Sequence, residues 1–201
     1  MGRARAFTPG WLENESIWLH MEYKYLLELL KAGLYKEFFE DFKTQCIPFL
    51  DPAVYGRSPL ENSSFIVSSA NPNPRIHGKG FVARLSGSTA EFIHMWQLMM
   101  FGKKPFVLED GELMLHFKPC LPKYLIDERL QIECTFLGRT KVIYHLSEAN
   151  DFIPDRYNIG VIWLTNQEGK TKGYQTDELR GEVAEAVRSG KIIKIEVELQ
   201  R

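Results

Sequence analysis

The spacing of the apolar residues changes near Gly102, and this change constrains the fold more than any other feature of the sequence. Before it, apolar residues recur at three- and four-residue steps, which is the period of a helix with one buried face. After it, short segments alternate apolar and polar residues, as strands do: ELMLHFKP, LQIECTFLG, TKVIYHL and NIGVIWL. The sequence therefore predicts an α+β chain, with a helical part over residues 1–102 and a β-sheet-rich part over residues 103–201.

The helical part is predicted to contain three helices. The apolar spacing places them at residues 13–34, 35–47 and 89–101. Gly33 supplies a stop for the first helix, Pro48 closes the second and Gly102 follows the third. The first two helices form a hairpin, which is the repeating unit of helical barrels and also occurs in many bundles.

A long segment over residues 51–84 separates the second and third helices and is rich in Gly, Pro, Ser and Asn. Loops longer than about 12 to 15 residues in compact domains are usually functional or disordered. Embedded apolar residues favour an ordered loop that lies on the core: Tyr55, Leu60, Phe65, Ile66, Val67 and Phe81.

The β-sheet-rich part is predicted to end with one late helix and one strand. DELRGEVAEAVRSGK has the pattern of an amphipathic helix, and IIKIEVEL has that of a strand.

Charge and motif content narrow the classes of function. The formal net charge is -1, so no overall field favours nucleic acid or an anionic membrane. No apolar run is long enough for a membrane span, which favours a cytoplasmic protein. The 3 cysteines lie among apolar neighbours without metal-type spacing and are predicted to be buried thiols. No GxSxG, GxGxxG, Walker, HExxH or CxxC motif supports a nucleophilic hydrolase, a nucleotide enzyme or a zinc site.

The first candidate binding segment is FTPGWLENESIWLH. Glu13 and His20 are seven positions apart, so they share one face if the first helix already includes Glu13. A carboxylate and an imidazole on one face suit a sugar hydroxyl and an anion. The alternative is structural, because Glu is favoured in any first helical turn and a His among apolar residues is often part of the core.

The second candidate is RLSGSTAEF, at the start of the third helix. Ser88 and Glu91 match a capping box, which places unpaired backbone N–H groups at a helix N-terminus. Such a terminus attracts anions, Gly87 permits close approach of a ligand, and Ser86 adds a hydroxyl donor. The alternative is again structural, since capping boxes stabilise helices in proteins of every class.

Four segments, in order, resemble the C-terminal end of the cellobiose and chitobiose phosphorylases, glycoside hydrolase family 94. TPGWLENESIWLH is similar to the family pattern TPG-x-x-ENGG-x-x-x-H, and RLSGSTAEF is similar to WLTGTAAW. DGELMLHFKPCLP and FLGRTKVIYH resemble two further motifs of the family's C-terminal β-domain. The resemblance covers residues 7–145.

The resemblance implies that residues 1–102 are the last helices of an (α/α)6 barrel. It further implies that His20, Ser86 and Gly87 bind phosphate and that Glu13 binds the acceptor sugar. The family performs inverting phosphorolysis of β-linked saccharides, with inorganic phosphate as co-substrate and without a metal or other cofactor. Its general acid, an Asp, and a phosphate-binding Arg would precede this chain.

The same resemblance gives the partners: an oligosaccharide, inorganic phosphate, the missing N-terminal part of the enzyme and, since the family is often dimeric, a second copy. Glu15 and Ser16 replace the family's Gly-Gly, and Leu12 stands where some members have a sugar-binding Lys. These departures indicate a divergent subgroup with its own acceptor. Two other classes stay open: a non-catalytic carbohydrate-binding or structural module, and a fragment of a helical-barrel glycoside hydrolase.

Overall fold

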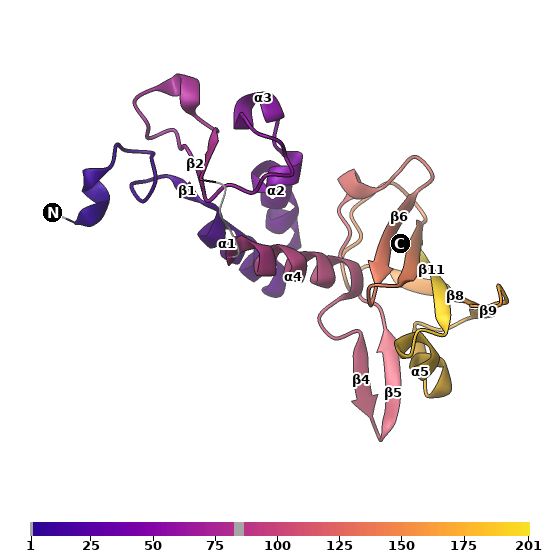
Figure 1. The fold of residues 1–201 in the computed structure, drawn as a ribbon. Helices are drawn as coiled ribbons and strands as arrows, with labels where there is room; N and C mark the ends of the chain where they lie inside the picture. The colour runs from indigo at the N-terminus through magenta and orange to yellow at the C-terminus, as the bar shows by residue number, and fades with distance from the viewer. Residues whose placement is uncertain (1, 83–86) are drawn as a thin grey trace. The chain divides into compact units, whose positions relative to one another are not determined.

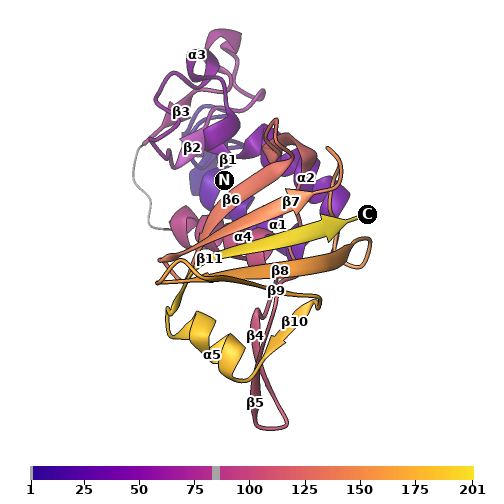
Figure 2. The ribbon, with the colours of Figure 1, turned by 90° about the vertical axis from the view of Figure 1, so that its right-hand side faces the viewer.

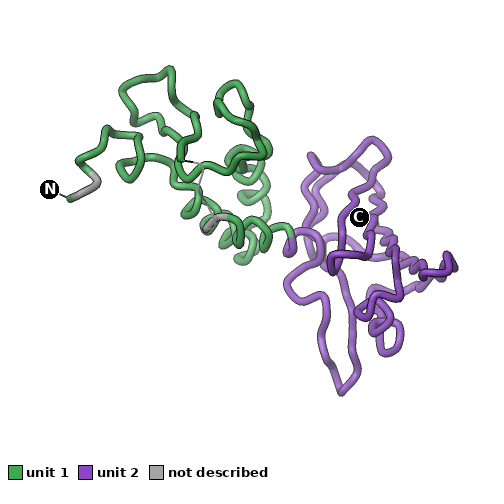
Figure 3. The backbone as a smooth tube through the Cα atoms, viewed as in Figure 1, with its two compact units in different colours: residues 1–96 green, residues 97–201 purple. Residues whose placement is uncertain are grey.

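A computed structural model describes residues 2–82 and 87–201 and has a mixed α+β fold (Figure 1). The chain divides into two compact units, Met1–Trp96 and Gln97–Arg201 (Figure 3). The point of division lies inside helix α4 (Gly87–Phe101), whereas the predicted boundary between residues 102 and 103 lies just after this helix.

The first unit contains the predicted helical hairpin, formed by α1 (Leu19–Lys31) and α2 (Tyr35–Gln45). Gly33 ends α1 with a positive φ of 75°. Its N–H donates to the Leu30 carbonyl at 3.2 Å, and the Leu34 N–H donates to the Leu29 carbonyl at 3.0 Å. These two bonds form a Schellman motif, as expected for a Gly stop.

The start of the first helix differs from the prediction, which places it at Glu13. Leu12 and Glu15 have positive φ values of 48° and 61°, which no right-handed helix contains. Residues 9–15 therefore form turns, and α1 begins only at Leu19. The argument that Glu13 and His20 share one helical face does not hold.

The long segment is ordered over its described residues, 51–82, as its apolar residues predict. The short helix η2 (Ile47–Phe49) precedes it, and it contains α3 (Pro52–Tyr55), β2 (Phe65–Ile66), η3 (Pro74–Ile76) and β3 (Gly80–Phe81). Strand β2 joins β1 (Ile17–Trp18) and β3 in a three-stranded sheet. Tyr55, Ile66 and Val67 are buried, but Leu60 is 95% exposed and contributes nothing to the core. A further short helix, η1 (Arg3–Ala6), lies near the N-terminus.

The second unit is built on two sheets (Figure 2). A five-stranded sheet has the order β6-β7-β11-β8-β9, and a smaller one has the order β10-β5-β4. In the larger sheet, β11 runs parallel to β7 and antiparallel to β8. The strands of the second unit are β4 (Phe106–Glu109), β5 (Glu112–His116), β6 (Gln131–Phe136), β7 (Thr140–Leu146), β8 (Asn158–Asn166), β9 (Thr171–Tyr174), β10 (Glu178–Arg180) and β11 (Ile192–Gln200).

Alternation along the central strand decides which face of the larger sheet is the core. Ile195, Val197 and Leu199 of β11 are buried, whereas Glu196 and Glu198 point to the other face. The short helices of this unit are η4 (Lys123–Leu125) and α5 (Glu182–Arg188).

The predicted late helix is too long. Its first residues form β10, which pairs with β5, and α5 begins only after Gly181. Gly181 has φ 56° and ψ -129°, a backbone conformation that favours Gly, so the helix cannot extend through it.

The predicted third helix is confirmed as α4, whose Met95 and Met99 are buried. Cys46 and Cys120 are buried as predicted, while Cys134 is half-buried. Burial raises the pKa of the Cys46 and Cys134 thiols to about 12, so both are protonated at neutral pH. Among residues 2–82 and 87–201, no helix is both long and apolar enough to span a membrane.

Candidate functional site

The entry into α1 fixes the position of His20. The Leu19 N–H donates to the Ser64 carbonyl at 3.1 Å, which ties the start of the helix to the ordered loop. The Trp18 ring stacks on Phe65 with 5.7 Å between ring centroids, and it meets the His20 ring edge-on at 6.5 Å. His20 is therefore held between β1 and the first turn of α1, with its imidazole partly exposed.

The imidazole of His20 faces the beginning of α4. Its Nε2 lies 3.8 Å from Oε1 of Glu91, which is four residues after Gly87, the first residue of α4. Four residues of helix rise about 6 Å, so the backbone of Glu91 lies about one helical turn from the N-terminal end of α4. The two candidate segments, far apart in the sequence, therefore meet in the first unit.

Glu91, the contact of His20, is also the predicted last member of a capping box. As the last member of a capping box, Glu91 would bond the backbone at Ser88, whose side chain, like the whole of Ser86, lies outside the described part of the chain. The Glu91 Oε1 atom lies 3.8 Å from His20 Nε2, and Oε2 is buried without a hydrogen-bonding partner among the described residues.

Glu13 does not join this pair in the described part of the chain. It lies in the turn between Trp11 and Asn14, which are joined by an isolated β-bridge, and its side chain is exposed without a hydrogen bond or ion pair to any described residue. The turn is held by Asn14, whose Nδ2 donates to the Phe7 carbonyl at 2.8 Å. Of the four residues proposed for binding, His20 contacts α4 through Glu91. Ser86 lies outside the described residues, and the binding roles of all four stay predictions.

This arrangement combines groups that suit an anion with one carboxylate. Backbone N–H groups at a helix start and an imidazole both donate hydrogen bonds to anions. The Glu91 carboxylate accepts hydrogen bonds, so it suits a hydroxyl, a water molecule or the imidazole itself. In the described residues, no group of three or more His, Cys, Asp or Glu side chains is placed to hold a metal ion.

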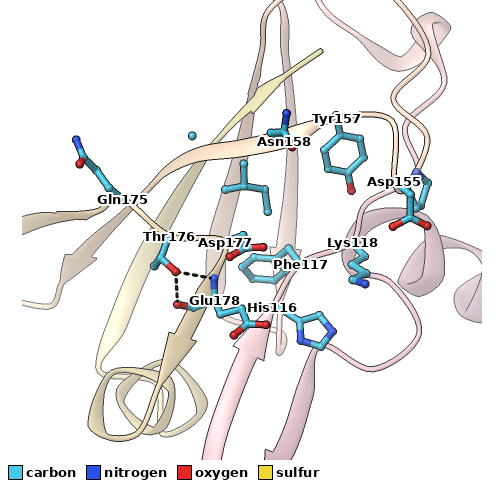
Figure 4. A pocket seen from close by; sticks show the side chains of 13 residues that line it. His116, Phe117, Lys118, Asp155, Tyr157, Asn158, Gln175, Thr176, Asp177 and Glu178 are labelled. Atoms are coloured by element: carbon cyan, nitrogen blue, oxygen red, sulfur yellow. Dashed lines mark hydrogen bonds between the residues drawn. The ribbon is translucent and has the colours of Figure 1, made fainter.

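A second site, which sequence reasoning missed, lies in the second unit. It is a pocket of about 420 Å³ between the end of β5, the start of β8 and the segment before β10 (Figure 4). Its polar lining includes His116, Lys118, Asp155, Asn158 and Asp177. No motif could have revealed it, because its walls come from three separate segments that only the sheet topology brings together.

Comparison of the chain with protein-family models and curated proteins gives no match that bears on either site. No protein-family model matches the chain, and no curated protein matches it.

Proposed function

We propose that this chain is the C-terminal portion of an inverting glycoside phosphorylase. The complete enzyme would cleave a β-linked disaccharide or oligosaccharide with inorganic phosphate and release a sugar 1-phosphate. Residues 1–102 would be the last helices of an (α/α)6 barrel, followed by the β-sheet-rich domain. This part would supply contacts to phosphate and to the acceptor sugar, and the general acid would come from the preceding part of the enzyme.

The observation that carries this proposal is the approach of His20 to the start of α4. The resemblance assigns one phosphate ion to the imidazole of His20, the Ser86 hydroxyl and the Gly87 amide. A single phosphate can contact all three only if these segments are neighbours. The 3.8 Å contact between His20 and Glu91, one turn into α4, supports that requirement.

A second observation supports the barrel. Helix α1 buries Leu19, Leu26 and Leu30 on one side, yet Met21 and Tyr25 are exposed on the opposite side. This outer side also carries Lys24 and Glu28, so α1 is an amphipathic helix with two large apolar residues on its exposed side. Those two residues suit neighbours that belong to the preceding part of the enzyme.

The chemistry requires little from this portion beyond binding. Phosphate is already a nucleophile, so phosphorolysis needs no general base; positive and N–H groups must hold the ion beside the anomeric carbon. A helix N-terminus, a hydroxyl and an imidazole suit that role. Glu13, exposed on its turn, would contact the acceptor sugar only when the complete enzyme surrounds it.

The test uses the longer enzyme that contains this chain. Incubation with cellobiose or laminaribiose should release a sugar 1-phosphate only when phosphate is present. His20→Gln should lower kcat/KM for phosphate about 10- to 100-fold, because a charge-assisted hydrogen bond is worth about 1.5–3 kcal/mol. His145→Gln, a matched substitution on β7, should leave the rate unchanged. Equal rates with and without phosphate would overturn the proposal.

Glu91 favours one alternative, hydrolysis by the complete enzyme. An inverting hydrolase needs a carboxylate that activates water, and Glu91 has a buried oxygen without a hydrogen-bonding partner among the described residues. Under that alternative, free sugar forms without phosphate and Glu91→Gln abolishes the reaction. Under phosphorolysis, Glu91→Gln changes only the binding of phosphate. If the longer enzyme catalyses neither reaction, a non-catalytic module is the better description.

A further inference from the structure

We propose that the pocket between β5, β8 and β10 is a binding site for a neutral saccharide, separate from the site at His20. This inference does not depend on phosphorolysis. It rests on the chemistry of the pocket walls, which belong entirely to the second unit.

The polar groups of the pocket are available to a ligand. The side chains of Asp155, Asn158, Gln175 and Asp177 have no hydrogen-bonding partner among the described residues, and all four are exposed. Gln175 lies across the pocket from Asp155 and Lys118 (Figure 4). The polar groups therefore surround the cavity instead of converging on one point, in keeping with the absence of a metal-binding cluster among the described residues.

The mixture of groups selects for hydroxyls. Carboxylates accept hydrogen bonds, the Lys118 ammonium donates them, and the amides of Asn158 and Gln175 do both. A sugar hydroxyl is both donor and acceptor, so a ring that carries several hydroxyls can use both kinds of group at once. The pocket volume of about 420 Å³ lies within the range typical of small-molecule sites.

Charge argues against anionic ligands. Asp155, Asp177 and Glu178 line the pocket with Lys118 as the opposing charge. Burial lowers the pKa of His116 and the Lys118 ammonium lowers it further, although Glu178 and Asp177 act in the opposite direction. His116 is therefore neutral at pH 7, and the lining carries a net negative charge that disfavours sugar phosphates.

Charge does not make the pocket a cation site either. One carboxylate oxygen of Glu178 already accepts a hydrogen bond from Arg180 at 2.8 Å. Lys118 lies on the same side of the pocket as Asp155 (Figure 4), and its positive charge would repel a polyamine. A neutral ligand avoids both conflicts.

Two internal contacts hold the walls in place without a ligand. The Tyr157 hydroxyl donates to the Pro119 carbonyl at 2.8 Å, which fixes the ring at the edge of the pocket. The Thr176 hydroxyl donates to the Glu178 carbonyl at 3.0 Å and accepts from the Glu178 N–H at 3.1 Å. Because these contacts already fix two walls, binding loses little additional conformational entropy.

The experiment titrates the 201-residue chain with cellobiose, laminaribiose and maltose in phosphate-free buffer, followed by calorimetry and by amide chemical shifts. At least one disaccharide should bind, with shift changes at residues of the pocket. Asp177→Ala should weaken this binding about tenfold or more, because a hydrogen bond to a charged group is lost. Glu128→Ala removes an exposed carboxylate of the same unit outside the pocket and should bind as the parent chain does.

Three results would overturn the inference. The first is no binding at millimolar saccharide, and the second is binding that Asp177→Ala leaves unchanged. The third is a preference for glucose 1-phosphate or spermidine over every neutral sugar. Because phosphate is absent, these outcomes are independent of the phosphorolysis test: a failure here leaves that proposal standing, and the reverse also holds.

Discussion

Tyr55 organises the long loop of the first unit through its hydroxyl group. The hydroxyl oxygen lies 2.6 Å from the Glu61 carbonyl and 2.6 Å from Ser63 Oγ, and it accepts from the Ser63 N–H at 3.0 Å. Tyr55 and Ser63 are both buried. Tyr55→Phe leaves these buried groups without their partner and should lower the free energy of unfolding by about 1–3 kcal/mol. Urea denaturation followed by circular dichroism measures the loss.

The matched control for this substitution is Tyr25→Phe. Tyr25 is exposed and donates to Oδ2 of Asp41 at 2.7 Å, so water replaces the lost bond. We expect a change within about 0.5 kcal/mol, as for most surface substitutions. Equal effects of the two substitutions would show that the buried network does not stabilise the loop.

At the scale of the elements, Gly33 at the end of α1 tests whether its positive φ alone requires a glycine, because side-chain packing plays no part there. A Cβ at Gly33 would meet only Tyr35 Cε2 at 3.8 Å, so space is open and the positive φ is the sole penalty. Gly33→Ala should therefore cost about 1 kcal/mol. Gly33→Asn should cost less, because Asn tolerates the left-handed conformation better than Ala does. Thermal unfolding of the two variants gives the comparison, and a stable Gly33→Ala would contradict the capping argument.

The elements that the sequence predicts well are those with a long, clear period. The hairpin of α1 and α2, helix α4 and strands β5 to β8 and β11 all follow their apolar spacing. Strands β4 and β9 have 4 residues each and lie at sheet edges. So few residues show too little alternation of apolar and polar side chains to distinguish a strand from a turn. The parallel pairing of β11 with β7 joins distant segments and has no local signal.

The candidate sites show the same limit. His20 and the start of α4 are identifiable as separate motifs, because a helix terminus and a spacing of residues are local properties. The contact of His20 with Glu91 depends on how α1 and α4 approach each other, and the pocket at Asp177 depends on sheet order. Neither arrangement is encoded in a short stretch of sequence.

At the scale of the whole molecule, the exposed apolar residues of the first unit test whether this chain is part of a barrel. Met21 on α1 is 53% exposed and Ile93 on α4 is 62% exposed. If other barrel helices cover these residues in the longer enzyme, Met21→Gln should destabilise that enzyme by about 1.5–3 kcal/mol. In the 201-residue chain the same substitution removes exposed apolar surface, so it should leave stability unchanged within about 0.5 kcal/mol and reduce binding of a hydrophobic dye.

A loss of stability in the longer enzyme but not in the 201-residue chain distinguishes a residue buried in a barrel from an ordinary surface residue. Lys24→Gln changes an exposed position on the same helix and should have little effect in either protein. If Met21→Gln is neutral in the longer enzyme as well, α1 has no further neighbour and the barrel is excluded. If it destabilises the longer enzyme alone, the last helices of a barrel explain the exposed apolar residues of α1.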